Sequence, residues 1–225
     1  MYKIELHLHT RYSSGCSLLE EKEIIAGYKA AGYSGIVVTD HFNRDTYRML
    51  DIDPDGPGEK LDRFFLGYRK LKEEGEKQGI RVYKGVELRF DENYNDYLFL
   101  GFSDDLIADP GKIFPMTPME FADYHRPTGS LLIQAHPFRW MCTPADPRAL
   151  DGVEVMNRHP GHDSRNHLAL EMAEQNPHLI RTGGSDTHET HHMCRGGIVA
   201  KVLPKDEKEL VALLRSGDYT IIQPE

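Results

Sequence analysis

Short apolar runs typical of strands recur along the whole chain, and amphipathic segments typical of helices separate most of them. The predicted strands are 3–9, 35–41, 80–88, 97–102, 130–136, 152–157, 179–183, 198–202 and 219–222. The predicted helices are 19–31, 60–78, 118–126, 164–175 and 205–216, and a loop rich in Asp, Pro and Gly is predicted over 45–59. This alternation predicts parallel strand pairing through helical crossovers.

About seven such strands, with no linker and no internal repeat between them, favour a closed or nearly closed α/β barrel. An open doubly wound sheet is the alternative, but the Gly-rich GxGxxG turn typical of that fold is absent from the sequence. The length of 225 residues suits one α/β barrel. We therefore predict a single barrel domain over residues 1–225.

The balance of charged residues limits the partners of the chain. With 36 acidic and 27 basic residues, the formal net charge is −9, which argues against sequence-independent binding of duplex nucleic acid. A small anionic substrate stays compatible, because a metal-loaded pocket can be locally positive. The sequence has no long apolar run and no signal peptide, so no membrane association is expected. Three widely spaced cysteines predict a reducing cytoplasm as the location.

Polar residues interrupt the apolar strands at one end only. A parallel strand that is buried on both faces is expected to be almost wholly apolar. Here, histidines and acids gather where successive strands finish, and the active sites of α/β barrels lie at that end. These strand-end residues are His7, His9, Asp40, His41, Glu87, His136, Asp186 and His188.

The spacing of these residues indicates which side chains point the same way. His7 and His9 share one face of their strand, because alternate residues of a strand point to the same side. Asp186 and His188 repeat that spacing. Only one of Asp40 and His41 can point inward unless the strand has already bent. We favour His41 as a ligand, with Asp40 orienting a neighbour.

Taken together, these residues predict a metal site. A lone histidine is more often structural than a ligand, and a lone glutamate is usually exposed. Burying such a set without a cation would cost several kcal/mol per carboxylate. A donor set of histidine nitrogens and carboxylate oxygens without thiolates suits zinc, manganese or iron. More than four ligands suit two or three ions that share a bridging acid.

Six motifs, in order over about positions 3–200, resemble the PHP (polymerase and histidinol phosphatase) superfamily: HLHTRYS, VVTDH, GVEL, QAHPF, GVEV and GGSDTH. The resemblance implies a distorted seven-stranded (β/α) barrel similar to a TIM barrel. It also implies two or three divalent ions and hydrolysis of phosphate esters by a metal-bound hydroxide. It assigns His7, His9, Glu87 and Asp186 to one ion, Glu87, His136 and a further residue to the second, and His41 and His188 to the third.

The sequence departs from the family pattern at two places. Members usually carry an Asp or His five to six residues after the second histidine of HxH, where this chain has Ser14 and Gly15. Cys16 is adjacent, but we expect it to be a small buried residue. We therefore expect the third ion to be bound weakly or to be absent. Asp96 stands where many members carry a histidine. Its carboxylate can replace the imidazole as a metal ligand, or it can be a solvated loop acid.

Further residues have expected roles in catalysis and substrate binding. We expect Asp186 and His188 to be catalytic, with His188 or a metal-bound water assisting the leaving alcohol. Arg139 and Arg158 follow strand ends and are expected to bind the phosphate with their planar guanidinium groups, although each can equally be a solvated surface arginine. Glu154 faces inward or orients a neighbour, and we do not include it among the ligands.

The predicted function is therefore that of a metal-dependent phosphoesterase of the phosphatase type, acting on a small phosphorylated metabolite or a nucleotide. A nuclease or proofreading-type module acting on single-stranded nucleic acid is one alternative, which the acidic charge balance disfavours. A metal-binding module without catalysis is another, motivated by the residues at 14 and 15. A metal-assisted C–N hydrolase is a more distant possibility.

Overall fold

The computed structural model describes residues 1–56 and 60–224. The strands are β1 (Tyr2–Leu8), β2 (Tyr33–Val38), β3 (His41–Phe42), β4 (Arg81–Arg89), β5 (Asp96–Leu100), β6 (Leu131–Gln134), β7 (Gly152–Asn157), β8 (Ile180–Gly184), β9 (Ile198–Ala200) and β10 (Tyr219–Ile221). The α-helices are α1 (Glu21–Ala30), α2 (Arg44–Met49), α3 (Leu61–Phe64), α4 (Leu66–Gln78), α5 (Asp104–Ile107), α6 (Pro110–Ile113), α7 (Pro118–His125), α8 (Asn166–Gln175) and α9 (Glu207–Ser216). The 3₁₀ helices are η1 (Arg126–Thr128), η2 (Pro147–Ala149) and η3 (Thr190–His192).

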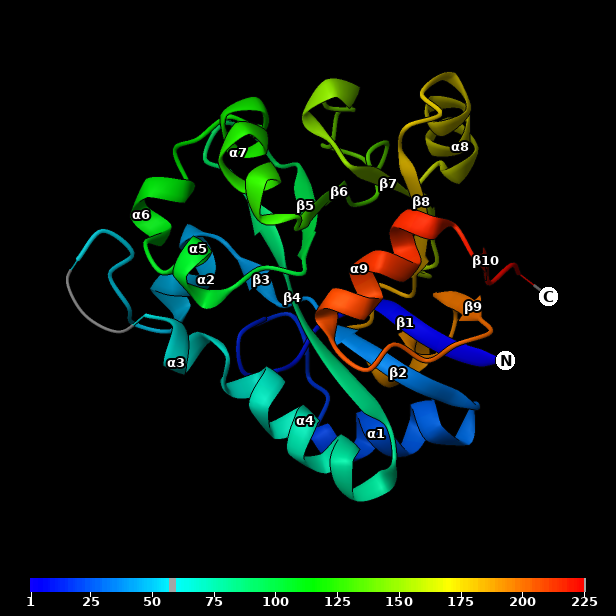
Figure 1. Ribbon diagram of the computed structural model, residues 1–225. Coiled ribbons are helices and arrows are strands. Elements are labelled where there is room, and N and C mark those ends of the chain that lie inside the picture. The colour runs from blue at the N-terminus through cyan, green and yellow to red at the C-terminus, as the bar shows by residue number, and fades with distance from the viewer. Residues whose placement is uncertain (57–59, 225) are drawn as a thin grey trace.

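The strands form a nearly closed barrel. In the described part of the chain, the order around the barrel is β1-β2-β4-β5-β6-β7-β8. The chain beyond β8 meets β1 again, where the His9 N–H donates to the Thr187 carbonyl at 3.0 Å. Figure 1 shows α1 and α4 along one flank and α8 beside β7. The predicted distorted TIM-like barrel is therefore confirmed.

The pairing is not parallel throughout, contrary to the expectation from the sequence. β5 runs antiparallel to both β4 and β6. Only residues 90–95 separate β4 from β5, whereas a parallel return needs a crossover of about a dozen residues or more. β9 and β10 add a second antiparallel departure beside β1. The short connection explains the reversal between β4 and β5, whereas helices lie in the connections from β5 to β6 and from β9 to β10.

Two other segments differ from their predicted form. The predicted helix 60–78 is divided into α3 and α4 at Phe65. The predicted loop 45–59 contains most of α2, whose first turn is stabilised because the Asn43 side chain accepts a hydrogen bond from the Thr46 N–H at 2.9 Å. Residues 57–59 of that predicted loop lie outside the described residues.

Both faces of β1 are buried, and this explains its composition. Ile4 and Leu6 belong to an apolar cluster that also contains residues of α9. Leu8 belongs to a cluster that contains residues of α1. His7 and His9 point to the other side of the strand and are also fully buried. Packing of the apolar face therefore fixes the direction of both imidazoles.

In the described part of the chain, we find no helix whose length and apolar character would let it span a bilayer.

Candidate metal centre

The predicted ligands other than Asp96 come together at one end of the barrel. Glu87 lies in their midst, with its Oε1 3.1 Å from His7 Nε2 and 3.2 Å from His136 Nε2. Its Oε2 lies 2.6 Å from His41 Nδ1 and 3.6 Å from His9 Nε2. The two oxygens of Glu87 thus face different histidines, which is the arrangement expected of a carboxylate that bridges two ions.

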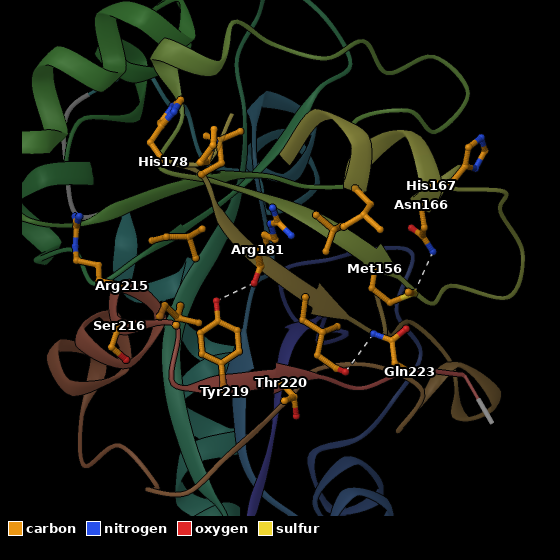
Figure 2. A pocket seen from close by; sticks show the side chains of 18 residues that line it. Met156, Asn166, His167, His178, Arg181, Arg215, Ser216, Tyr219, Thr220 and Gln223 are labelled. Atoms are coloured by element: carbon orange, nitrogen blue, oxygen red, sulfur yellow. Dashed lines mark hydrogen bonds between the residues drawn. The ribbon is translucent and has the colours of Figure 1, made fainter. Parts of the chain in front are cut away.

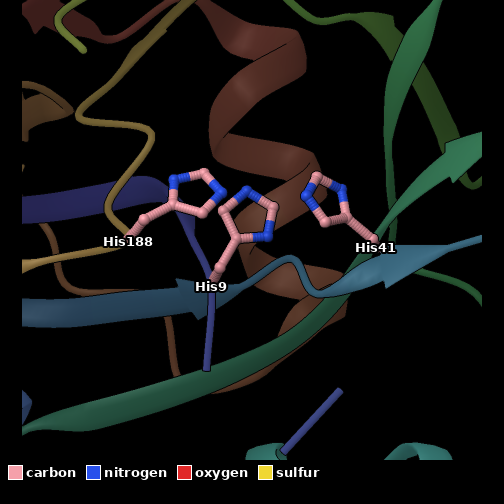
Figure 3. Close-up of side chains that lie close together, drawn as sticks. All are labelled: His9, His41 and His188. Carbon is pink, nitrogen blue, oxygen red and sulfur yellow. The ribbon is translucent and has the colours of Figure 1, made fainter. Parts of the chain in front are cut away.

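Asp186 and His188 complete the group. Asp186 Oδ1 lies 3.5 Å from His7 Nε2 and 3.4 Å from His9 Nε2. The His188 ring stacks on that of His9, with 4.2 Å between the ring centroids. His41 lies on the other side of His9, as Figure 3 shows.

Three buried nitrogens in this group have no hydrogen-bond partner among the described residues. These are Nε2 of His7 and Nε2 of His9, both on fully buried side chains, and Nδ1 of His41. Buried polar atoms are almost always paired, so such atoms need an explanation. Imidazole nitrogens that face carboxylate oxygens in a buried group are good ligands for a divalent cation. The donor set therefore fits the metal ions that the sequence predicts.

The far side of the His7 ring is held by a carboxylate. His7 Nδ1 lies 3.0 Å from Glu154 Oε1, and because a carboxylate only accepts, Nδ1 carries the proton of that bond. Its Nε2, beside Glu87 and Asp186, is then the nitrogen available to a metal ion. Glu154, which is fully buried, thus orients a ring that faces the centre.

A longer chain of contacts holds the His9 ring. Ser14 Oγ donates to Asp40 Oδ1 at 2.9 Å and lies 3.2 Å from His9 Nδ1. Since the Ser14 proton is used by Asp40, the His9 Nδ1–H donates to Ser14. Asp40 therefore orients a neighbour, as the sequence indicated, and it does so through Ser14. His41 faces Glu87, whereas both oxygens of the Asp40 carboxylate accept hydrogen bonds from Thr10 and Ser14.

The backbone is adapted to the site at three positions. A Cβ on Gly184 would lie 2.4 Å from the His7 Cβ and 2.9 Å from Glu154 Oε1, so only glycine leaves room for this pair. His136 and Asp186 have positive φ angles of 28° and 53°. Such strained backbone in residues other than glycine is concentrated at functional sites.

The histidines and acids shift each other's pKa values strongly. Burial lowers the pKa of His7, but the nearby carboxylates, Asp186 first among them, outweigh it and hold this pKa well above its ordinary value. Burial raises the pKa of Glu87, but His7 and neighbouring imidazoles hold it well below its usual range. Burial also lowers the pKa of His136, yet hydrogen bonds to Cys142 and Glu87 raise it to about 10. A cation that binds here must therefore displace protons.

Asp96, a predicted ligand, lies beside the group, and the guanidinium of Arg139 lies between Asp96 and Asp186. Arg89 donates to both oxygens of its buried carboxylate, at 2.8 and 2.9 Å. Arg139 Nη2 lies 3.4 Å from Asp96, and Arg139 Nη1 lies 3.6 Å from Asp186 Oδ2. The charge of Asp96 is thus balanced by arginines, and its role as a ligand stays a prediction.

The two predicted phosphate-binding arginines differ in position. The Arg139 side chain is 21% exposed at the rim of the group. Arg158 is half-buried, and among the described residues its Nε has no hydrogen-bond partner. Arg139 thus lies beside the carboxylates of Asp96 and Asp186, while Arg158 Nε has no such pairing in the described part of the chain.

Cys16 corrects one expectation from the sequence. It is exposed, whereas a small buried residue was expected. Its Sγ lies 3.4 Å from His41 Nε2. Partial burial raises the pKa of the thiol, but hydrogen bonds to His188 and His41 outweigh it and lower this pKa to about 6. Its position shortly after the HxH motif was the sequence feature that pointed to the metal centre. The shape of the turn that brings it to His41 cannot be deduced from the sequence.

A hollow elsewhere on the protein contains none of the predicted site residues. It has a volume of about 760 Å³ and lies between β7, β8, α8 and the segment around β10 (Figure 2). Across it, the Tyr219 hydroxyl donates to the Arg181 carbonyl at 2.8 Å. Its rim includes the exposed His167.

Comparisons with known proteins agree with this geometry. A family model described as the PHP domain matches residues 5–179. No curated protein matches the sequence. A two-domain protein from Bacteroides vulgatus, described as containing a predicted PHP-like metal-dependent phosphoesterase, is similar in structure, with a TM-score of 0.69 and 17% identity. That likeness covers 99% of this chain and 65% of the Bacteroides chain.

Two further solved structures share the fold. PsfC from Pseudomonas syringae has a TM-score of 0.69 at 17% identity, covering 98% of this chain and 91% of its own. A lesion-specific endonuclease from Pyrococcus furiosus has a TM-score of 0.63 at 19% identity, covering 98% of this chain and 57% of the endonuclease. This chain thus spans less than two thirds of two of these proteins.

Proposed function

This chain belongs to the PHP domain family, whose model covers residues 5–179, and from that premise we propose that it is a metal-dependent phosphoesterase of the phosphatase type. Its proposed substrate is a small phosphorylated metabolite or a nucleotide. The observation that carries the proposal is the buried group around Glu87, in which unpartnered Nε2 atoms of His7 and His9 face shared carboxylates.

The proposed metal ligands follow the contacts around Glu87 and Asp186. One ion would be held by His7, His9, Glu87 and Asp186, and a second by Glu87, His136 and a further residue. His41 and His188 would contribute to a third. Zinc, manganese and iron all suit such nitrogen and oxygen donors. When bound, divalent ions of this kind polarise phosphoryl oxygens and lower the pKa of the attacking water.

The protein's own groups have separate tasks. Arg139 is proposed to bind phosphoryl oxygens with its planar guanidinium, since it lies at the rim and 3.6 Å from Asp186. Arg158 is proposed as a second anion-binding group. Asp186 keeps its negative charge, because His7 and His9 hold its pKa well below the usual range despite burial. It can therefore accept a hydrogen bond from the attacking water.

His188 has two proposed roles that exclude each other. Its Nδ1 donates to the Asp186 backbone carbonyl at 3.0 Å, so only Nε2 is free for other chemistry. A protonated Nε2 would donate to the leaving alcohol. An Nε2 bound to a metal carries no proton and would not.

Turnover by reconstituted protein tests the proposal. Metal-depleted protein would be loaded separately with Mn²⁺, Zn²⁺ or Fe²⁺ and assayed on 4-nitrophenyl phosphate, nucleoside monophosphates and a single-stranded oligonucleotide. We expect ester hydrolysis with at least one metal and its loss in His9→Ala and Asp186→Ala. His167→Ala, at an exposed histidine beside the hollow of Figure 2, is the control. No hydrolysis of any ester with any of the three metals would refute the proposal.

The nuclease alternative is separated by the same assay. The fold likeness to the Pyrococcus endonuclease favours it, whereas the net charge of −9 disfavours binding of a polyanionic backbone. Cleavage of the oligonucleotide that weakens steeply with salt, without hydrolysis of small esters, would favour the nuclease. Metal binding and phosphate binding without any turnover would indicate a module that lacks catalysis.

A further inference from the structure

Cys16 lies beside three histidines that gather at the mouth of the metal centre. The ring of His9 lies between those of His188 and His41, with centroid distances of 4.2 and 4.3 Å (Figure 3). Each of the three offers a ring nitrogen within 4.8 Å of the others. Cys16 Sγ lies 3.4 Å from His41 Nε2, and His41 in turn lies beside His188, with 5.8 Å between the ring centroids. The thiol thus joins this histidine group from a turn of the chain outside the barrel strands.

An observation independent of the cysteine also points to a cation here. Among the described residues, Nε2 of the fully buried His9 and the buried Nδ1 of His41 have no hydrogen-bond partner, and both histidines belong to this group. Three imidazoles with ring nitrogens this close together offer lone pairs that one divalent cation can bind. The positions where a further hard ligand was expected, Ser14 and Gly15, supply none, since Ser14 bonds to His9 and Asp40.

The spacing of Cys16 and His41 suits two ligands of one zinc ion. Zinc lies about 2.3 Å from thiolate sulfur and about 2.1 Å from imidazole nitrogen, in tetrahedral sites. These lengths place the sulfur and the nitrogen about 3.6 Å apart across a tetrahedral angle. The observed separation is 3.4 Å, so both atoms can bind the same ion with little movement.

Within the metal centre of the proposed function, we propose that Cys16, His41 and His188 bind a zinc ion as a third metal. The Cys16 thiolate takes the place of the carboxylate or imidazole that Ser14 and Gly15 do not provide. Because thiolate is a soft ligand, this site prefers zinc to manganese, while the deeper sites offer only nitrogen and oxygen. Ligation through Nε2 also removes His188 as the proton donor for the leaving alcohol.

Cobalt substitution gives a readout that does not depend on turnover. A thiolate bound to Co²⁺ produces an intense charge-transfer absorption in the near ultraviolet. We expect this band in the wild-type protein and in Cys194→Ser and Cys142→Ser, and its loss in Cys16→Ser. Cys142 is a needed control, because its Sγ lies 3.9 Å from His136 Nδ1.

Zinc content gives the second measurement. Cys16→Ser is expected to hold one zinc ion fewer per chain than wild type after dialysis, with affinity at that site weakened at least about 10- to 100-fold. Cys16→Asp should restore the zinc content without the charge-transfer band, since carboxylate is a hard ligand. Thermal unfolding of the metal-free proteins checks that the substitution at this exposed position leaves the fold intact.

The outcomes separate this proposal from the phosphoesterase proposal. Metal binding without a thiolate band, or a band that disappears in Cys142→Ser, overturns thiolate ligation by Cys16 and leaves the phosphoesterase proposal standing. Equal zinc content in wild type and Cys16→Ser also overturns it. A wild-type protein that binds no metal overturns both proposals.

Discussion

Replacing Glu154 by glutamine should weaken metal binding although Glu154 is not itself a proposed ligand. Its Oε1 lies 3.0 Å from His7 Nδ1, and its Oε2 accepts from the His136 N–H at 3.1 Å and from Asn157 Nδ2 at 3.0 Å. All of these partners donate. A glutamine amide has one accepting oxygen, so in either orientation its NH₂ group meets at least one donor.

The size of the effect follows from that mismatch. A hydrogen bond to a charged group contributes about 1.5–3 kcal/mol, and about 1.4 kcal/mol corresponds to a factor of ten in affinity. Loss of one such bond behind His7 therefore predicts metal binding that is weakened by about 10- to 150-fold. Substitutions of groups that orient metal ligands usually cost about 10–100-fold, in the same range.

Competition with a chromophoric chelator at fixed pH measures this affinity. Asp151→Asn is a matched control, because Asp151 directly precedes β7, accepts from the Leu132 N–H at 2.9 Å and lies 3.5 Å from His125 Nε2. It alters a carboxylate–histidine pair outside the metal centre. We expect it to change stability but not metal affinity. Equal affinities of wild type and Glu154→Gln would refute the argument that Glu154 orients His7.

Three further predictions concern pH, packing and metal removal. The raised pKa values of His7 and His136 mean that metal binding releases protons, so metal affinity should rise by about tenfold per pH unit for each proton displaced. Chelator competition at pH 6 and pH 8 measures this, and an affinity independent of pH would contradict it. Gly184→Ala should lower the free energy of unfolding by about 1–3 kcal/mol and weaken metal binding, because the added Cβ would overlap His7. Urea unfolding measures the loss of stability, and the control is Gly27→Ala, whose Cβ meets only the flexible end of Met193. Metal at about 100 times its Kd should add about 2.7 kcal/mol to the free energy of unfolding over chelator-treated protein, and equal urea midpoints with and without metal would count against a folded-state site.

The sequence predicted the convergence of the site because barrel geometry brings strand ends together. Alternation along β1 was enough to place His7 and His9 on one side, and the same spacing relates Asp186 and His188. The neighbours of these residues were harder to predict. The roles of Ser14 and Cys16 depend on the turn after β1, which has no periodic pattern that would reveal its shape.

Because one strand direction was predicted wrongly, the contacts of Asp96 could not be predicted from the sequence. The alternation of strands and helices predicted parallel pairing, so the partner of Asp96 could not be deduced. In the structure, the antiparallel pairing of β4 and β5 places Arg89 directly opposite Asp96. Cross-strand neighbours of opposite charge attract each other, and here the arginine binds both carboxylate oxygens. The direction of a single strand thus decides what this acid contacts.

The closure of the barrel between its first strand and the chain after β8 has a consequence for biosynthesis. His7 bonds to Glu154, 147 residues later in the sequence, and Glu5 accepts from the Ser185 N–H, 180 residues later. At about 5–20 residues per second, a ribosome takes about 10–40 seconds to supply those partners. Until then a nascent chain lacks Asp186, His188 and the carboxylate of Glu154 that orients His7. Metal selection therefore belongs to the finished pocket, after the polypeptide has left the ribosome.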